Sequence, residues 1–337
     1  MMKLYKIIFF NSMMLGTLIS ISSYSWLSMW MGLEINLLSI IPLFSSTKNI
    51  FSSESSLKYF ITQALASLIL LFSIIMMLST TEFITKTLNP TLLILLNSAL
   101  MTKLGAAPFH FWFPEVMEGL NWFNCLIMLT WQKIAPMILI MNNQFNNNFM
   151  VFIIMMSLII STTMGFNQIS LRKILTFSSI NHIAWMISSM MISFTIWLIY
   201  FLIYSLITIN IIIMFLYFNS FYMKQLINSF NNNKMLKFSF MVNFLSLGGL
   251  PPFIGFMPKW LTINWMINNN FYLLTFLLIT LTLIMLYIYI RIIFTSLIMS
   301  YTENKTTNIN PNKFLFYFTN FILITSLIMC TYLFNFL

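Results

Sequence analysis

The sequence predicts an all-α, polytopic membrane protein with about eleven transmembrane helices. Hydrophobic residues make up 60% of the 337 positions, charged residues make up only 7%, and the mean hydropathy is +0.91. A soluble domain carries about 25% charged residues, so this composition excludes an ordinary soluble fold. A spanning helix needs about 20 apolar residues, and the chain divides into segments of that kind. The expected spans are 4–22, 25–45, 57–79, 90–113, 122–141, 149–166, 171–192, 195–218, 238–267, 271–298 and 314–336.

The first of these spans also resembles a signal peptide, because it has a basic start and an apolar centre. Its apolar run is nearly long enough to cross a bilayer, and no A-x-A-like cleavage site follows it. We therefore expect this segment to be retained as the first helix.

Basic residues between the spans predict the orientation. If the segments alternate in direction, one side of the membrane receives eleven basic residues and the other receives Lys86 alone. Positive loops mark the cytoplasm-equivalent side, so the N-terminus is expected there and the C-terminus on the opposite side. The eleven are Lys3, Lys6, Lys48, Lys58, Arg172, Lys173, Lys224, Lys234, Lys237, Lys305 and Lys313.

Two of the expected spans are interrupted by glycine and proline. The fourth breaks at Gly105-Ala-Ala-Pro108, and the ninth contains the run GGLPPFIGFMP at 248–258. Proline removes a backbone donor and breaks a helix, and paired interruptions in two halves point to the central site of a transporter. The broken spans are five apart, so the second unit would be inverted. We expect a first five-helix repeat at 1–148 (broken near 104–109), a second, inverted repeat at 149–298 (broken near 248–258), and a loop with a C-terminal helix at 299–337.

Ionisable residues near the middle of apolar segments are the candidate functional groups. They are Glu34, Lys103, Lys133 and Lys259. A charge at bilayer depth costs at least about 2.5 to 3.5 kcal/mol. Each lysine alone could be a snorkelling side chain, but four such residues together favour a polar pathway for protons. His182, in the seventh span, is as compatible with a packing role as with proton transfer.

The two breaks place their lysines differently. Lys103 precedes the first break, near the C-terminal end of a half-helix, where the helix dipole favours a cation. Lys259 follows the second break, near a half-helix N-terminus, which should disfavour one. His110, Glu115 and Glu118 follow the first break, and we expect the two glutamates near the interface in a structural or loop role.

Composition excludes most cofactor sites. Cys125 and Cys330 are too few to hold an iron–sulfur cluster, and no glycine-rich nucleotide motif is present. The two histidines, His110 and His182, could in principle hold a haem, although cavity or packing roles are commoner. Because the basic residues mostly flank apolar segments, their excess is explained by topology and nucleic acid is not an expected partner.

Four segments resemble a known family. These are KLGAAPFHFWFPEVMEG (103–119), TWQKIAP (130–136), SLRKILTFSSINHIAWM (170–186) and LGGLPPFIGFMPKW (247–260). They are similar to signature segments of the antiporter-like membrane subunits of NADH:ubiquinone oxidoreductase, respiratory complex I. The length and MGLEINLLSIIP (31–42) most resemble the mitochondrial form of animals, which is shorter at the N-terminus than the bacterial form.

The resemblance implies a subunit of the membrane arm that helps to couple quinone reduction by NADH to proton translocation. It implies a Glu34–Lys103 pair, a central Lys133, Lys259 near the exit side and His182 between them. It also implies no redox centre in this chain, with NADH, flavin, iron–sulfur clusters and ubiquinone held by partner subunits. The other partners would be membrane-arm and accessory subunits and membrane lipids.

The implied location is the mitochondrial inner membrane, with the N-terminus on the matrix side and the C-terminus on the intermembrane-space side. Two alternatives stay open. The family shares its fold with multisubunit cation antiporters, so a stand-alone cation/proton antiporter subunit is one. A purely structural subunit is the other.

Overall fold

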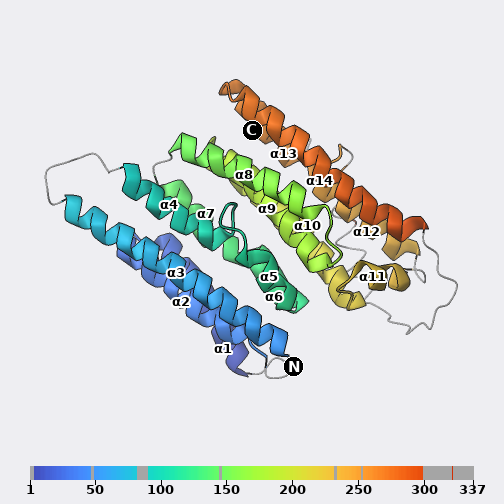
Figure 1. The fold of residues 1–337 in the computed structure, drawn as a ribbon, viewed down its shortest axis with the longest axis horizontal. Coiled ribbons are helices and arrows are strands. Elements are labelled where there is room, and N and C mark those ends of the chain that lie inside the picture. Colours follow the sequence, from blue (N-terminus) through green and yellow to red (C-terminus); the bar gives the residue numbers. More distant parts are fainter. Residues whose placement is uncertain are drawn as a thin grey trace. The chain divides into compact units, whose positions relative to one another are not determined.

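The computed structural model describes residues 4–46, 49–81, 90–143, 146–230, 234–251 and 253–298, together with Phe321. Every named element in these residues is an α-helix (Figure 1). The helices are α1 (Leu4–Ser22), α2 (Trp26–Phe44), α3 (Ile50–Thr81), α4 (Pro90–Leu104), α5 (Trp112–Gly119), α6 (Trp122–Leu129), α7 (Trp131–Asn142), α8 (Asn147–Gly165), α9 (Leu171–Met190), α10 (Phe194–Phe218), α11 (Met223–Phe230), α12 (Lys234–Gly248), α13 (Phe256–Asn268) and α14 (Tyr272–Ile298). The predicted all-helical fold is confirmed.

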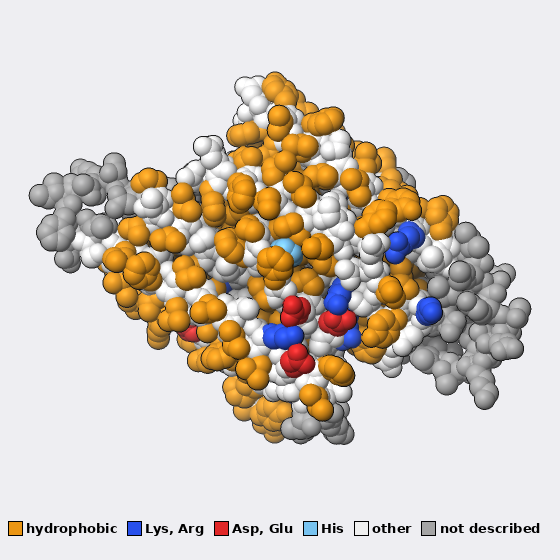
Figure 2. Space-filling model, viewed as in Figure 1, with side chains coloured by type: hydrophobic (Ala, Val, Ile, Leu, Met, Phe, Trp, Pro, Cys, Tyr) orange, Lys and Arg blue, Asp and Glu red, His pale blue; other side chains and the backbone are white. Residues whose placement is uncertain are grey.

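The described residues contain seven helices or helix pairs that are long and apolar enough to cross a membrane. They cover Leu4–Ser22, Trp26–Phe44, Ile50–Ser79, Trp122–Asn142, Asn147–Gly165, Phe194–Phe218 and Tyr272–Thr295, and α4 is a shorter apolar helix. The chain is thus a multi-span membrane protein. The last expected span, 314–336, lies outside the described residues. Figure 2 shows hydrophobic side chains over most of the face drawn, as expected where a surface meets lipid.

The chain separates into two compact units, Met1–Ile153 and Ile154–Leu337. In the first unit, α1 packs closely on α2 through two glycines. A Cβ added to Gly16 would lie 2.8 Å from the Asn36 nitrogen, and one added to Gly32 would lie 2.6 Å from the Ser20 nitrogen. Small residues at such crossings let two backbones approach, as is usual for helices in lipid.

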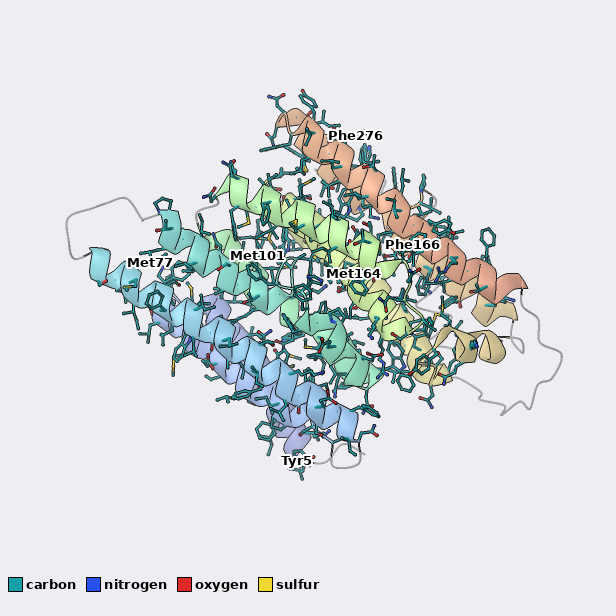
Figure 3. The ribbon with its side chains drawn as sticks, in the orientation of Figure 1. Tyr5, Met77, Met101, Met164, Phe166 and Phe276 are labelled. Carbon is teal, nitrogen blue, oxygen red and sulfur yellow. The ribbon has the colours of Figure 1, made fainter. Side chains whose placement is uncertain are left out.

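Helix α3 packs against α2, α4 and α5. It begins at Ile50, earlier than the expected 57. Its first turn packs against α5. A Cβ on Gly119, at the end of α5, would lie 2.5 Å from the Phe51 oxygen, so α5 lies directly on the first turn of α3. Met77 of α3 and Met101 of α4, labelled in Figure 3, are both buried.

In the second unit, α9 is buried along almost its whole length, and α10, α13 and α14 pack against it. Phe166, at the end of α8, stacks on Tyr287 of α14 with ring centroids 5.5 Å apart (Figure 3). The short helix α11 occupies a stretch expected to be a loop. The Gln225 side chain accepts hydrogen bonds from the backbone nitrogens of Phe221 (2.8 Å) and Tyr222 (3.3 Å), which caps the start of α11.

Three helices of the first unit and three of the second start at a constant spacing in the sequence. The starts of α3 and α10 are Ile50 and Phe194, those of α4 and α12 are Pro90 and Lys234, and those of α5 and α13 are Trp112 and Phe256. The number of residues separating the two members is the same in all three pairs.

Candidate functional site

The first break begins where α4 ends at Leu104. Gly105 has φ +74, a left-handed conformation that favours glycine. Its nitrogen donates to the oxygens of Met101 (3.0 Å) and Thr102 (3.2 Å), and the Ala106 nitrogen also donates to Met101 O (3.1 Å). This is a Schellman-type helix end. It stops α4 directly after Lys103.

Lys103 is buried in the last turn of α4, with 9% of its surface exposed. Glu34 of α2 is close enough to interact with it electrostatically. Within the described part of the chain, the two do not form a direct ion pair, and the buried Oε1 atom of Glu34 has no hydrogen-bond partner there. In the first unit, the predicted pairing of Glu34 with Lys103 therefore involves an electrostatic interaction without a direct ion pair among the described residues.

Lys133 is 2% exposed and lies in the first turn of α7. An interruption that the sequence analysis did not predict precedes it, because α6 ends at Leu129 and α7 starts at Trp131. At Thr130 the backbone φ and ψ are −114° and −72°, and both its nitrogen (3.0 Å) and its hydroxyl (2.7 Å) donate to Leu126 O.

Two amide side chains hold α7 against α2. Asn36 Nδ2 donates to Gln132 Oε1 and Gln132 Nε2 donates to Asn36 Oδ1, both at 3.0 Å. We call this Asn36–Gln132 pair of hydrogen bonds the clasp. Glu34 is two residues from Asn36 and Lys133 is next to Gln132, so the clasp joins the two helices that carry Glu34 and Lys133. These two amides were not predicted from the sequence. The available signal was an uncharged polar side chain inside each apolar segment.

The second break has the same backbone form as the first. Helix α12 ends at Gly248, and Gly249 has φ +77. The Gly249 nitrogen donates to Leu245 O and Ser246 O, both at 3.1 Å, and Leu250 N donates to Leu245 O at 3.4 Å. The next turn also matches, since Phe109 N donates to Ala106 O (2.9 Å) in the first break and Phe253 N donates to Leu250 O (3.0 Å) in the second.

Lys259 of α13 is 7% exposed and turns back toward α12. Its ammonium donates to Gly248 O (2.9 Å) and Leu247 O (3.4 Å), the last carbonyls of α12. A helix C-terminus stabilises a cation. The ammonium therefore contacts the end of α12, whereas the sequence analysis considered only the start of the following half-helix. Lys259 follows a half-helix start in the sequence, but its flexible side chain places the charge at the other half-helix end.

His182 lies on the buried helix α9. Its Nδ1 is 2.9 Å from the Tyr200 hydroxyl of α10, and its ring centroid is 5.1 Å from that of Tyr204. One turn further along α9, the Trp185 ring lies 5.8 Å from the Lys259 ammonium. The predicted histidine of the second unit is therefore part of α9, and the predicted lysine contacts the same helix.

Glu115 lies on α5, near the N-terminal part of α3. It forms an ion pair with Lys58 at 3.1 Å, and Lys58 pairs with Glu54 at 2.9 Å. All three side chains are more than one-third exposed. Figure 2 shows acidic and basic side chains gathered in one area of a mostly hydrophobic face. His110, in contrast, is buried, and its Nδ1 is 3.3 Å from Pro108 O.

In the part of the chain that the structure describes, no group of three or more His, Cys, Asp or Glu residues could hold a metal ion. The chemistry available at the site is therefore that of buried amines, one carboxyl group, an imidazole and hydroxyl groups. Such groups can hold and transfer protons.

A family model described as NADH:quinone oxidoreductase/Mrp antiporter, TM, matches residues 23–286. The chain belongs to this family. It is 48% identical to NADH-ubiquinone oxidoreductase chain 2 of Anopheles gambiae over 335 residues, covering 98% of both chains. It is 49% identical to the same chain of Aedes aegypti over 336 residues, again covering 98% of both. These relatives confirm the resemblance to the mitochondrial form of animals that the length and MGLEINLLSIIP predicted.

Two solved structures share the fold. A chain of respiratory complex I from Thermus thermophilus with bound aureothin superimposes with a TM-score of 0.83 at 21% identity, covering 97% of this chain and 77% of that one. A chain of the Mrp complex from Dietzia sp. superimposes with a TM-score of 0.74 at 15% identity, covering 89% and 61%.

Proposed function

We propose that the chain is a core membrane-arm subunit of proton-translocating NADH:ubiquinone oxidoreductase in the mitochondrial inner membrane. The relatives named NADH-ubiquinone oxidoreductase chain 2 support the assignment to this complex. One observation carries the proposed role in proton movement. Three lysines, Lys103, Lys133 and Lys259, are each buried beside a helix interruption, in a protein whose helices cross a membrane. Burying an amine and interrupting a helix at membrane depth both cost free energy, so their combination points to a function.

The proposed topology has eleven spans in two inverted five-helix repeats, 1–148 and 149–298, followed by a loop and a C-terminal helix at 299–337. Three observations support it: the matched helix starts, the shared hydrogen bonding of the two breaks, and the boundary between compact units at Ile153, close to the expected 148. The N-terminus is on the matrix side and the C-terminus on the intermembrane-space side. The excess of basic residues on one side of the membrane supports this orientation.

In the first unit, the relay uses Glu34, Lys103 and Lys133. An ionised Glu34 attracts the Lys103 ammonium, so a change in the charge of either residue changes the proton occupancy of the other. The clasp between Asn36 and Gln132 holds Glu34 and Lys133 on joined helices, which keeps the relay groups in fixed register.

In the second unit, the relay uses His182 and Lys259. The carbonyls of Leu247 and Gly248 hold the protonated amine of Lys259. Loss of the proton weakens these contacts and frees the side chain to move. The histidine exchanges protons through the hydroxyl of Tyr200.

The work for this transfer comes from elsewhere in the complex. Moving one charge against 100 mV costs about 2.3 kcal/mol. We propose that this chain has no redox centre, and that NADH, flavin, iron–sulfur clusters and ubiquinone are bound by partner subunits. Its other partners are membrane-arm subunits, accessory subunits and lipids.

The test replaces Lys133 by Met in the intact complex. Methionine keeps most of the length of the lysine side chain and has no charge, so assembly should persist while the number of protons translocated per NADH falls. Lys224→Met is the matched control, because Lys224 is an exposed lysine on α11. An unchanged proton stoichiometry in the Lys133 variant would refute the relay.

A second candidate function is a stand-alone cation/proton antiporter subunit. The superposition on the Mrp complex of Dietzia sp. favours it. Native electrophoresis of the source membranes separates the two candidates. Migration with NADH dehydrogenase activity in a very large assembly supports the oxidoreductase, and migration in an assembly without that activity supports the antiporter.

A further inference from the structure

Two buried polar atoms in the first unit lack hydrogen-bond partners among the described residues, and they are chemically complementary. Gln63 of α3 is 4% exposed, and its Nε2 is unpaired there. The Oε1 atom of Glu34, on α2, is also buried and has no hydrogen-bond partner among the described residues. An amide nitrogen can only donate and a carboxylate oxygen can only accept. Leaving either group unsatisfied in a protein interior is costly, so a shared hydrogen bond would satisfy both.

The packing of α2 on α3 places these two residues at the same level. The helices are neighbours joined by a short loop, so they run in opposite directions. Trp30 Nε1 of α2 donates to Ser67 O of α3 at 3.2 Å. Near the loop, the hydroxyls of Ser46 and Ser52 are 2.6 Å apart, which fits the same register.

One helical turn from the Trp30–Ser67 contact toward the loop leads to Glu34 on α2 and to Gln63 on α3. Residues four apart lie on the same face of a helix, and both steps rise by about 6 Å. The faces that meet at Trp30 and Ser67 therefore continue to Glu34 and Gln63. Helix α3 also packs on α4, which carries Lys103.

We propose that Gln63 is a positioning residue for the Glu34–Lys103 pair, its side-chain amide donating to Glu34 Oε1 through one bridging water. The amide stabilises the carboxylate and keeps it oriented for its electrostatic interaction with Lys103. A bridging water transmits such a bond almost as well as direct contact. The inference rests on the proposed function, because it gives Gln63 a role only through Glu34.

The experiment measures proton translocation driven by NADH oxidation in sealed vesicles that contain the intact complex. Gln63→Leu and Gln63→Met remove the amide at similar volume. Both should lower the coupled rate about tenfold, the effect of losing one hydrogen bond to a charged group. Ser67→Ala is the control. Ser67 is one turn away on the same buried face, and its hydroxyl donates only to the local Ala64 O, so this variant should keep the normal rate.

A double-mutant cycle separates a positioning role from a packing role. If Gln63 acts through Glu34, Gln63→Leu should cause no further loss in the Glu34→Gln background. Losses that multiply in the double variant would overturn the inference, as would a normal rate in Gln63→Leu. If the Leu and Met variants do not assemble, Gln63→Asn, which keeps the amide but shortens its reach, is put through the same cycle.

The cycle also distinguishes this inference from the proposed function. A normal rate in Glu34→Gln alone would overturn the relay itself. An impaired Glu34→Gln variant with a normal Gln63→Leu variant would overturn only the role of Gln63.

Discussion

The helix breaks that begin at Gly105 and Gly249 have the same backbone conformation, but the charged residue that follows each break differs. Both begin with a left-handed glycine, and both have the same pattern of backbone hydrogen bonds. Each continues to a proline near the start of the next helix, followed by Glu115 in one case and Lys259 in the other. Glu115 points outward to the exposed Lys58, whereas Lys259 turns inward to the carbonyls of α12. The two breaks thus have the same backbone conformation. The residue after the proline differs, and it determines whether the charge faces an exposed ion pair or the carbonyls at the end of the preceding helix.

The second break is also the more tightly packed. A Cβ added to Gly255 would overlap the Ser246 oxygen, because the chain returns across α12 at that point. Phe111 occupies the matching place in the first break, and it is 70% exposed. The close approach in the second break leaves no room for a side chain, and it brings Lys259 within reach of the carbonyls.

The largest effect is expected for Gly255→Ala. The added methyl group would push against the Ser246 backbone, which cannot move without distorting α12, so the cost should exceed about 4 kcal/mol. We expect loss of the assembled protein on native gels. Phe111→Ala, at the matching place, should assemble normally. Normal assembly of the Gly255 variant would show that the second break is no tighter than the first.

The next effect compares the two lysines that carry the proposed relay. Lys259→Met leaves two carbonyls of α12 without their donor and should destabilise the protein by about 1 to 3 kcal/mol. Lys103→Met removes a buried charge without a direct ion pair, so its stability should be unchanged or higher. Thermal inactivation of the purified complex measures both. Equal shifts for the two variants would show that the carbonyl contacts of Lys259 do not stabilise the second break.

A smaller difference is expected between Gly249→Ala and Gly105→Ala. Both force an L residue into a left-handed conformation, at a cost of about 1 to 2 kcal/mol. A Cβ on Gly249 would also lie 2.9 Å from the Lys259 ammonium, whereas one on Gly105 would meet only the Phe113 ring at 3.3 Å. Proton translocation should therefore fall more in the Gly249 variant at comparable stability. A greater fall in the Gly105 variant would contradict this assignment.

The smallest effect is expected for Glu115→Gln. The ion pair with Lys58 is exposed, and Lys58 keeps its second partner, Glu54. Exposed pairs contribute little and are screened by salt. Translocation and stability should both stay close to normal, with any small loss disappearing at high ionic strength. A large, salt-independent loss would give this charge cluster a role in the relay.

Much of the helical framework could be predicted from the sequence. Apolar runs gave the positions of α1, α2, α8, α10 and α14 to within a few residues, because lipid forces every backbone group into a helix. Glycine and proline gave the place of both main breaks. Helix α11 and the interruption at Thr130 were not predicted, because polar capping and one threonine hydroxyl accompany them, and neither alters hydropathy.

The candidate site was predictable in its residues but not in its contacts. The cost of burying charge singled out Glu34, Lys103, Lys133 and Lys259 from the letters alone. The pairing of Asn36 with Gln132, and the contact of Trp30 with Ser67, depend on the rotation of each helix about its axis. Helix rotation is set by packing between segments, which no single segment encodes.

The sequence by itself determined that this chain lies in a membrane, where its helices break and which ionisable residues are buried. These follow from the cost of exposing polar backbone or charge to lipid, a property of each segment. Only the tertiary structure decided that the charge of Lys259 lies at the end of α12 instead of the start of α13. A lysine side chain reaches several ångströms, so the half-helix that stabilises its ammonium depends on which carbonyls the fold brings near.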